Sequence, residues 1–183
     1  MNQEVVHGIP DKHRIIQEGD IVSLDAGVIY KGYHSDAART HAVGEVSEEA
    51  KKLIQVTKES FFEGIKFAKA GNHLFDISGA IGRYAEERGY GVVRDLCGHG
   101  IGTALHEAPE IPNYEVGRKG VRLRPGMTLA IEPMINIGTH EVDWLDDDWT
   151  VVTRDGSLSA HYENTILITE GEPRILSLTC ENE

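Results

Sequence analysis

Leu96-Cys97-Gly98-His99-Gly100-Ile101-Gly102 is the stretch that decides how this chain of 183 residues is interpreted, and it runs on through His106 to Tyr114. Glycine and proline are too frequent here for a helix, and apolar and polar residues do not alternate as in a long strand. We therefore predict a loop. Two interpretations stay open at this point: a turn with incidental histidines, or a loop that presents functional side chains from a rigid scaffold.

The composition limits the class of protein. With 40% hydrophobic residues, the chain can bury the core of a single domain over residues 1–183. A formal charge of −12, without any lysine- or arginine-rich block, argues against a nucleic-acid-binding surface. Neither a membrane-spanning run nor a signal sequence is evident, so we expect no membrane partner and a cytoplasmic location. Cys97 and Cys180 do not form a C-x-x-C pair and are interpreted as thiols.

A β-hairpin with two aspartates is predicted near the N-terminus. Residues 21–30 and 33–43 are rich in strand-forming residues and flank a turn at Lys31-Gly32. That turn places Asp25 opposite position 38, so Asp36 is its diagonal neighbour, roughly 7–8 Å away on the same face. Asp25 lies between Leu24 and Ala26, and we expect it to be buried and to need a cation or hydrogen-bond donors.

Two helices are predicted after the hairpin. Ser47 can cap the first, whose apolar stripe stops before Gly71. The second is expected from about residue 75 to 88, and glycines within it are consistent with close packing. Further along, residues 128–137 and 162–169 have strand character, whereas the acidic residues 141–148 are interpreted as a solvated loop without a metal role.

Two more carboxylates lie among apolar residues in these later strands. Glu132 precedes Pro133, which indicates a sheet edge or a bulge. Glu163 lies in the last predicted strand, residues 162–169, beside another apolar run. No basic residues are expected to neutralise the four carboxylates, and an oxygen-rich set with one imidazole favours Mn²⁺, Fe²⁺ or Co²⁺ over a thiolate zinc site. The predicted ligands of a cage for two divalent ions are Asp25, Asp36, His99, Glu132 and Glu163.

The sequence resembles the type I methionine aminopeptidases of the pita-bread metallopeptidase group over essentially its whole length. The motifs that carry the resemblance are Val5-Val6-His7-Gly8-Ile9-Pro10, the hairpin with Asp25 and Asp36, Cys97-Gly98-His99-Gly100-Ile101-Gly102, His106-Glu107, Pro125-Gly126-Met127, Ile131-Glu132-Pro133-Met134 and Tyr162-Glu163-Asn164-Thr165. The implied fold is an α+β pita-bread fold, in which helices back a curved antiparallel sheet. The implied reaction is removal of the initiator methionine from the N-termini of nascent polypeptides, an activity that can take place at the ribosome.

The resemblance also assigns roles to residues. Asp25 would chelate one ion, Asp36 and Glu163 would bridge two, and His99 and Glu132 would bind the other. Such a pair of ions, Mn, Fe or Co with Zn as a further option, acidifies a water and polarises the scissile carbonyl. Glu132 would also transfer the proton to the leaving amine.

Four further positions are implied on the substrate side. His106 would stabilise the tetrahedral intermediate, and His7 would contact the substrate near the scissile bond. Leu105 and Trp149 match positions that line the pocket for the methionine side chain.

One departure from the family concerns the N-terminal half. Relatives carry a further segment before the His7-Gly8-Ile9-Pro10 strand, so residues 1–46 are interpreted as a strand remnant of the first half and residues 47–183 as the second half. One apolar sheet face should then be uncovered, which favours self-association or binding of the missing segment in trans. We expect low activity unless that segment is supplied.

Two other functions remain open on the sequence. A proline-directed aminopeptidase or dipeptidase would use the same metal ligands, although the His7-Gly8-Ile9-Pro10 motif argues against it. A non-catalytic pita-bread binding module would have no need to retain all five ligands.

Overall fold

A computed structural model describes residues 1–178 of the chain, and Cys180 lies outside them. The N-terminal part contains a short strand, β1 (Glu4–Val6), followed by the long hairpin of β2 (Ile21–Tyr30) and β3 (Tyr33–Ala42). Lys31 and Gly32 both have positive φ, as a two-residue hairpin turn requires. The register pairs Asp25 with Ala38 and residue 27 with Asp36, which confirms the predicted diagonal relation of the two aspartates.

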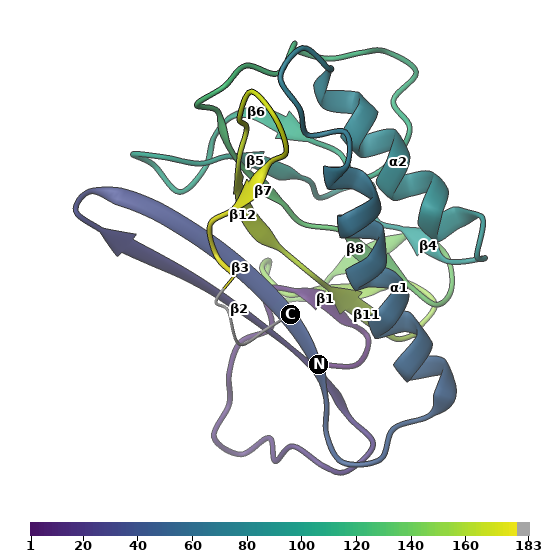
Figure 1. The fold of residues 1–183 in the computed structure, drawn as a ribbon. Helices are drawn as coiled ribbons and strands as arrows, with labels where there is room; N and C mark the ends of the chain where they lie inside the picture. Colours follow the sequence, from purple (N-terminus) through teal and green to yellow (C-terminus); the bar gives the residue numbers. More distant parts are fainter. Residues whose placement is uncertain (179–183) are drawn as a thin grey trace.

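The hairpin extends as a ribbon beyond the rest of the molecule (Figure 1). Its large apolar side chains are between 61% and 70% exposed, namely Leu24, Val28, Ile29, Tyr30 and Tyr33. Asp25 is exposed as well, contrary to the burial expected from its apolar neighbours. The expectation was wrong because those neighbours themselves lie on a ribbon that the described residues leave uncovered.

The two predicted helices are α1 (Glu48–Ile65) and α2 (Leu74–Glu86). The Ser47 hydroxyl caps α1 by accepting a hydrogen bond from the Ala50 N–H at 3.1 Å, as the sequence predicts. α1 ends at Ile65, earlier than the expected limit before Gly71, and turns follow it. The two helices pack against each other and lie on one side of the sheets (Figure 1).

The remaining strands are short and pair antiparallel. A five-stranded sheet has the order β13-β12-β7-β5-β6, and two three-stranded sheets have the orders β11-β8-β4 and β1-β10-β9. Their bounds are β4 (Gly91–Val92), β5 (Gly98–Gly100), β6 (Glu107–Ile111), β7 (Thr128–Ile131), β8 (Met134–Asn136), β9 (Val142–Trp144), β10 (Val151–Thr153), β11 (Ser159–His161), β12 (Asn164–Leu167) and β13 (Arg174–Ile175).

Three of these strands replace predicted loops. The segment around His99 contains β5 and β6, which pair with each other with a register shift after His99. A Cβ atom on Gly98 or Gly100 would collide with the backbone of Ala130 or Ala108, so the glycines that suggested a loop instead let the strands approach closely. β9 lies within the acidic segment 141–148 and pairs with β10.

The chain passes from one sheet to another at two corners. β7 is followed by β8 in a different sheet, with Glu132 and Pro133 between them, and β11 is followed by β12, with Tyr162 and Glu163 between them. The expected single strands 128–137 and 162–169 are therefore interrupted where their glutamates lie. Since proline cannot donate to a ladder, Pro133 ends the pairing of β7.

The largest core cluster fills the space between the helices and the five-stranded sheet. It includes Phe61 from α1, Ile77 and Ile81 from α2, and Leu129 and Ile166 from the sheet. Within the described residues, no helix combines the length and apolarity needed to cross a bilayer.

Candidate metal centre

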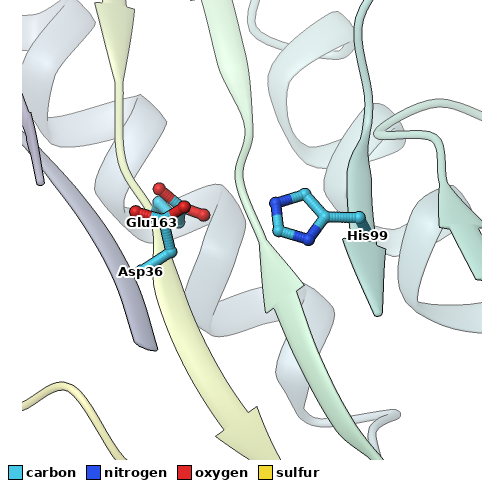
Figure 2. Close-up of side chains that lie close together, drawn as sticks. All are labelled: Asp36, His99 and Glu163. Carbon is cyan, nitrogen blue, oxygen red and sulfur yellow. The ribbon is translucent and has the colours of Figure 1, made fainter. Parts of the chain in front are cut away.

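Three predicted ligands lie together in the structure. Asp36 on β3, His99 on β5 and Glu163 just before β12 are buried, and one ligand atom from each lies within 4.8 Å of the others. Figure 2 shows the carboxylates of Asp36 and Glu163 side by side, with the imidazole of His99 turned toward them. Three segments that are distant in the sequence thus provide one concentrated donor set.

Main-chain contacts hold Asp36 beside Glu163. The Glu163 N–H donates to the Ala38 carbonyl at 2.9 Å. The Thr165 hydroxyl accepts from the Asp36 N–H at 2.8 Å and donates to the Asp36 carbonyl at 2.9 Å. One threonine side chain therefore binds both backbone groups of Asp36 and fixes the position from which its carboxylate projects.

His99 is oriented by its own strand. Its Nδ1 lies 2.8 Å from the Gly100 carbonyl oxygen. Because a carbonyl oxygen can only accept, Nδ1 carries the proton and Nε2 presents a lone pair. A neutral imidazole held by such a second hydrogen bond is the usual form of a histidine metal ligand.

Glu132 lies at the corner between β7 and β8 and joins this group. Its Oε1 is 3.7 Å from Nε2 of His99, and its Oε2 is 3.4 Å from Nε2 of His161. Asn113 donates from its side chain to the Glu132 carbonyl at 3.1 Å, which helps to fix the corner. The Glu132 side chain is thus placed between two imidazoles.

Asp25, which lies on the hairpin, is near the carboxylates of this cluster. Although the residue as a whole is exposed, partial desolvation of its carboxyl group raises its pKa. Proximity to Asp36 and Glu132 raises the pKa further, and His161 acts in the opposite direction. All five predicted ligands therefore lie close enough to influence one another electrostatically, with Asp25 on the solvent side.

The carboxylates lack a cationic partner within residues 1–178. Burial, with added repulsion from Glu132, Asp36 and Asp25, raises the pKa of Glu163 to about 10. No lysine or arginine nitrogen of the described chain forms an ion pair with these four side chains. Arg39 donates instead to the backbone carbonyl of Glu163, and its charge lowers the pKa of the Glu163 carboxyl by less than burial and the other carboxylates raise it. A divalent cation fits this donor set, because it would supply the positive charge that the described residues do not.

The predicted substrate-side residues fall into two groups. The rings of His106 and His99 meet edge to face with centroids 4.3 Å apart. The exposed rings of His7 and Trp149 stack with centroids 4.5 Å apart, at an interplanar angle of 19°. Leu105 belongs with the first group, since a Cβ on the glycine at 27 would lie 3.6 Å from Leu105 Cδ1 and 3.7 Å from an Asp36 oxygen.

A cavity of about 730 Å³ lies beside the carboxylates. Its wall includes His7 from the segment after β1, Asp25 from β2 and His161 from β11. Residues from two sides of the proposed centre thus border one open space that could admit a peptide N-terminus.

Three residues at this centre were not predicted from the sequence: Arg39, Thr165 and His161. His161 had a detectable signal, because it lies two residues before Glu163 and so on the same side of an extended segment. The predicted strand began one residue too late, at Tyr162, to include it. Cys97 is half-buried and is not part of the ligand cluster.

Residues 1–170 match the model of the family described as metallopeptidase family M24. The methionine aminopeptidase of Clostridium acetobutylicum is 60% identical over 181 residues, which cover 99% of this chain and 72% of the relative. Methionine aminopeptidase 1 of Bacillus subtilis is 52% identical over 170 residues, which cover 93% and 68%.

Solved structures agree with these relatives. The crystal structure of methionine aminopeptidase from Thermotoga maritima is 50% identical and has a TM-score of 0.94, with 97% of this chain and 72% of that chain covered. The prolidase from Pyrococcus horikoshii is more distant, at 28% identity and a TM-score of 0.75, with 97% and 45% covered. The pita-bread fold predicted from the motifs is thereby confirmed.

Proposed function

Because the chain belongs to metallopeptidase family M24, and within it to the methionine aminopeptidases of type I, it is a metal-dependent hydrolase of N-terminal methionine, and we propose that its active centre is the cluster described above. In this proposal two divalent ions are held by Asp25, Asp36, His99, Glu132 and Glu163. The observation that carries the proposal is the convergence of buried carboxylates and a lone-pair-bearing imidazole without any cationic partner among residues 1–178. When bound, such ions would supply a nucleophilic water and a Lewis acid for the scissile carbonyl.

The chain's own residues supply the proton transfer and the stabilisation of charge. Glu132 is the proposed proton carrier, since its carboxylate is only partly buried and lies beside the other ligands. His106 packs against His99 at the exposed side of the cluster, where it can donate to the oxyanion of the tetrahedral intermediate. His7 borders the cavity and is proposed to contact the substrate near the scissile bond.

Leu105 and Trp149 are proposed to bind the methionine side chain from two sides. Leu105 lies near Asp36, and Trp149 stacks on His7, so the two apolar surfaces flank the proposed centre. An apolar slot of this kind suits a thioether, which is polarisable and makes favourable contacts with aromatic rings.

The finer features of the biological role are also proposals. Mn²⁺, Fe²⁺ or Co²⁺, with Zn²⁺ as a further option, suit the oxygen-rich ligands. The proposed partners are the N-termini of nascent polypeptides at the ribosome, in the cytoplasm. In the domain division that we propose, residues 1–46 belong to the first pita-bread half and 47–183 to the second, and the apolar face of the hairpin is a surface for self-association or for an N-terminal segment in trans.

A reconstitution experiment tests the function. The purified chain is stripped of metal, reconstituted with Mn²⁺ or Co²⁺, and assayed on a Met-Ala-Ser peptide and on an Ala-Pro dipeptide. We expect release of free methionine that requires metal and no cleavage of the dipeptide. Cleavage of the Ala-Pro bond alone would instead establish a proline-directed enzyme. Failure to bind ions, together with no cleavage of either peptide, would instead support a non-catalytic binding module.

A further inference from the structure

His161 is a buried histidine, and a purely structural role does not explain its surroundings. Its side chain is 1% exposed, and its Nε2 makes no hydrogen bond among the described residues. An unsatisfied polar atom in a protein interior is costly, and an apolar side chain at the same place would avoid that cost. An imidazole at this place therefore requires a partner for Nε2, and the position of Nε2 indicates which group that partner is.

Nε2 of His161 faces Glu132. It lies 3.4 Å from Oε2, whereas the other carboxylate oxygen, Oε1, lies 3.7 Å from Nε2 of His99. The two imidazoles differ in what they present. His99 uses Nδ1 on the Gly100 carbonyl and so turns a lone pair toward the cluster. His161 can meet the carboxylate oxygen only with an N–H, because that oxygen accepts and does not donate.

The backbone of His161 is held in place from two directions. Its N–H donates to the Thr40 hydroxyl at 2.8 Å, and that hydroxyl donates to its carbonyl at 3.0 Å. In the sheet, His161 pairs with Met134, two residues after Glu132. His161 thus lies on the strand paired with β8, beside the corner that carries Glu132, and the imidazole is fixed relative to the carboxylate.

We propose that His161 is a positioning residue that donates a hydrogen bond from Nε2 to Oε2 of Glu132 and so fixes the orientation of this carboxylate toward the ion and the transferred proton. The inference rests on the proposed function, because it concerns the same centre. Residues that orient a ligand in this way typically contribute about 10–100-fold to metal affinity or to activity.

Two substitutions separate this role from simple packing. His161→Leu keeps an apolar body of similar size but removes the donor, and His161→Gln keeps an N–H₂ group at nearly the same distance from the backbone. Ser159→Ala is the matched control on β11, because Ser159 is equally buried but donates only to the Ile135 carbonyl at 3.3 Å. Urea unfolding of each metal-free variant measures the purely structural cost.

Calorimetric titration with Mn²⁺ and steady-state kinetics on Met-Ala-Ser provide two independent readouts. We expect His161→Leu to weaken Mn²⁺ binding by about 10–100-fold and to lower kcat by a similar factor with little change in KM. His161→Gln should recover most of both losses, and the Ser159→Ala control should retain wild-type values.

Wild-type Mn²⁺ affinity in the leucine variant would overturn the proposal, as would equal losses in the leucine and glutamine variants. Loss of one bound ion in both variants would instead make His161 a ligand, which also contradicts a positioning role. If the wild-type chain binds Mn²⁺ with the expected pattern but does not cleave Met-Ala-Ser, the proposed function fails while the role of His161 in orienting Glu132 stands.

Discussion

Two glycines in α2 provide a matched test of how tightly this helix is packed. A Cβ atom on Gly82 would lie 2.8 Å from the Tyr114 Cα and 3.1 Å from the Asn113 carbonyl oxygen. Both are backbone atoms of a segment that cannot move without disturbing the neighbouring sheet. A Cβ on Gly79 would instead lie 2.5 Å from Glu115 Oε2 and 2.8 Å from an Arg83 nitrogen, the mobile ends of an exposed ion pair.

The two alanine substitutions should therefore have opposite effects on the free energy of unfolding. Each gains about 1 kcal/mol from the higher helix propensity of alanine. At position 79 this gain is opposed only by the loss of a surface ion pair, worth about 0–1 kcal/mol, so Gly79→Ala should be neutral or stabilising. At position 82 the backbone must shift, which costs about 1–3 kcal/mol, so Gly82→Ala should destabilise by about 1 kcal/mol.

Urea unfolding and calorimetry measure this difference. With about 2 kcal/mol between the variants, their melting temperatures should differ by about 4–8 °C in a chain of this size. The urea midpoints should separate without a change in slope, which would show that the unfolded state is unaffected. Equal stabilisation by both substitutions would refute the reasoning, because it would mean that Gly82 has room for a methyl group.

Three further predictions concern the centre and one exposed turn. Glu132→Gln should lower kcat on Met-Ala-Ser by about 10²–10⁴-fold without lowering the melting temperature of the metal-free chain, because the substitution removes one charge from a group of mutually repelling carboxylates. A variant that retains kcat would contradict the proton-transfer role. Removal of metal with a chelator should abolish cleavage. Addition of Mn²⁺ at about 100 times its Kd should stabilise the chain by about 2.7 kcal/mol, which corresponds to a rise in melting temperature of about 5–11 °C. Hydrogen bonds from the Ser157 hydroxyl and from the Thr139 and Ser157 backbone lower the pKa of Asp155 from 3.8 to about 2, so its charge stabilises the fold above about pH 4 and this contribution is lost as the pH falls through 2. Asp155→Asn should therefore be less stable than wild type by about 1 kcal/mol at pH 7, after allowance for solvent screening, and this difference in stability should disappear between pH 4 and 2. Asp146→Asn, at an exposed position, serves as the control, and a difference that persists at pH 2 would exclude the ionic origin.

Local sequence signals predicted much of the fold because the corresponding structures depend on local chemistry. The turn at Lys31-Gly32 determines the hairpin register, since two residues of positive φ leave a single way to pair the strands. Ser47 determines where α1 begins through a hydrogen bond three residues away. In both cases the interacting groups are close in the sequence.

The errors arose where tertiary contacts decide the structure. The glycines around His99 are typical of loops, yet here they serve the close approach of β5 to its neighbours. The hydrophobic pattern around Glu132 and Glu163 predicts strands but not the transfer from one sheet to another. The exposure of Asp25 depends on what covers the hairpin, and periodicity carries no information about that.

The candidate centre was predictable in part. The motifs indicate which carboxylates and histidines belong together, and the structure brings Asp36, His99 and Glu163 within reach of a common ion. The residues that support them escape such reasoning. Thr165 acts through its contact with the backbone of Asp36, a pairing across 129 residues that no local pattern indicates.

The contact between Asp36 and Thr165 also has a consequence for folding, because it joins residues 129 positions apart in the sequence. Closing a long loop costs more conformational entropy than closing a short one, and contacts between distant residues slow folding. The hairpin and the helices can form early because their contacts are local, whereas Asp36 on β3 and Glu163 just before β12 meet only when two distant parts of the chain have come together. We therefore expect the capacity to hold a cation in this arrangement to arise late in folding, so that the rate at which the chain begins to bind metal would report on the formation of its long-range contacts.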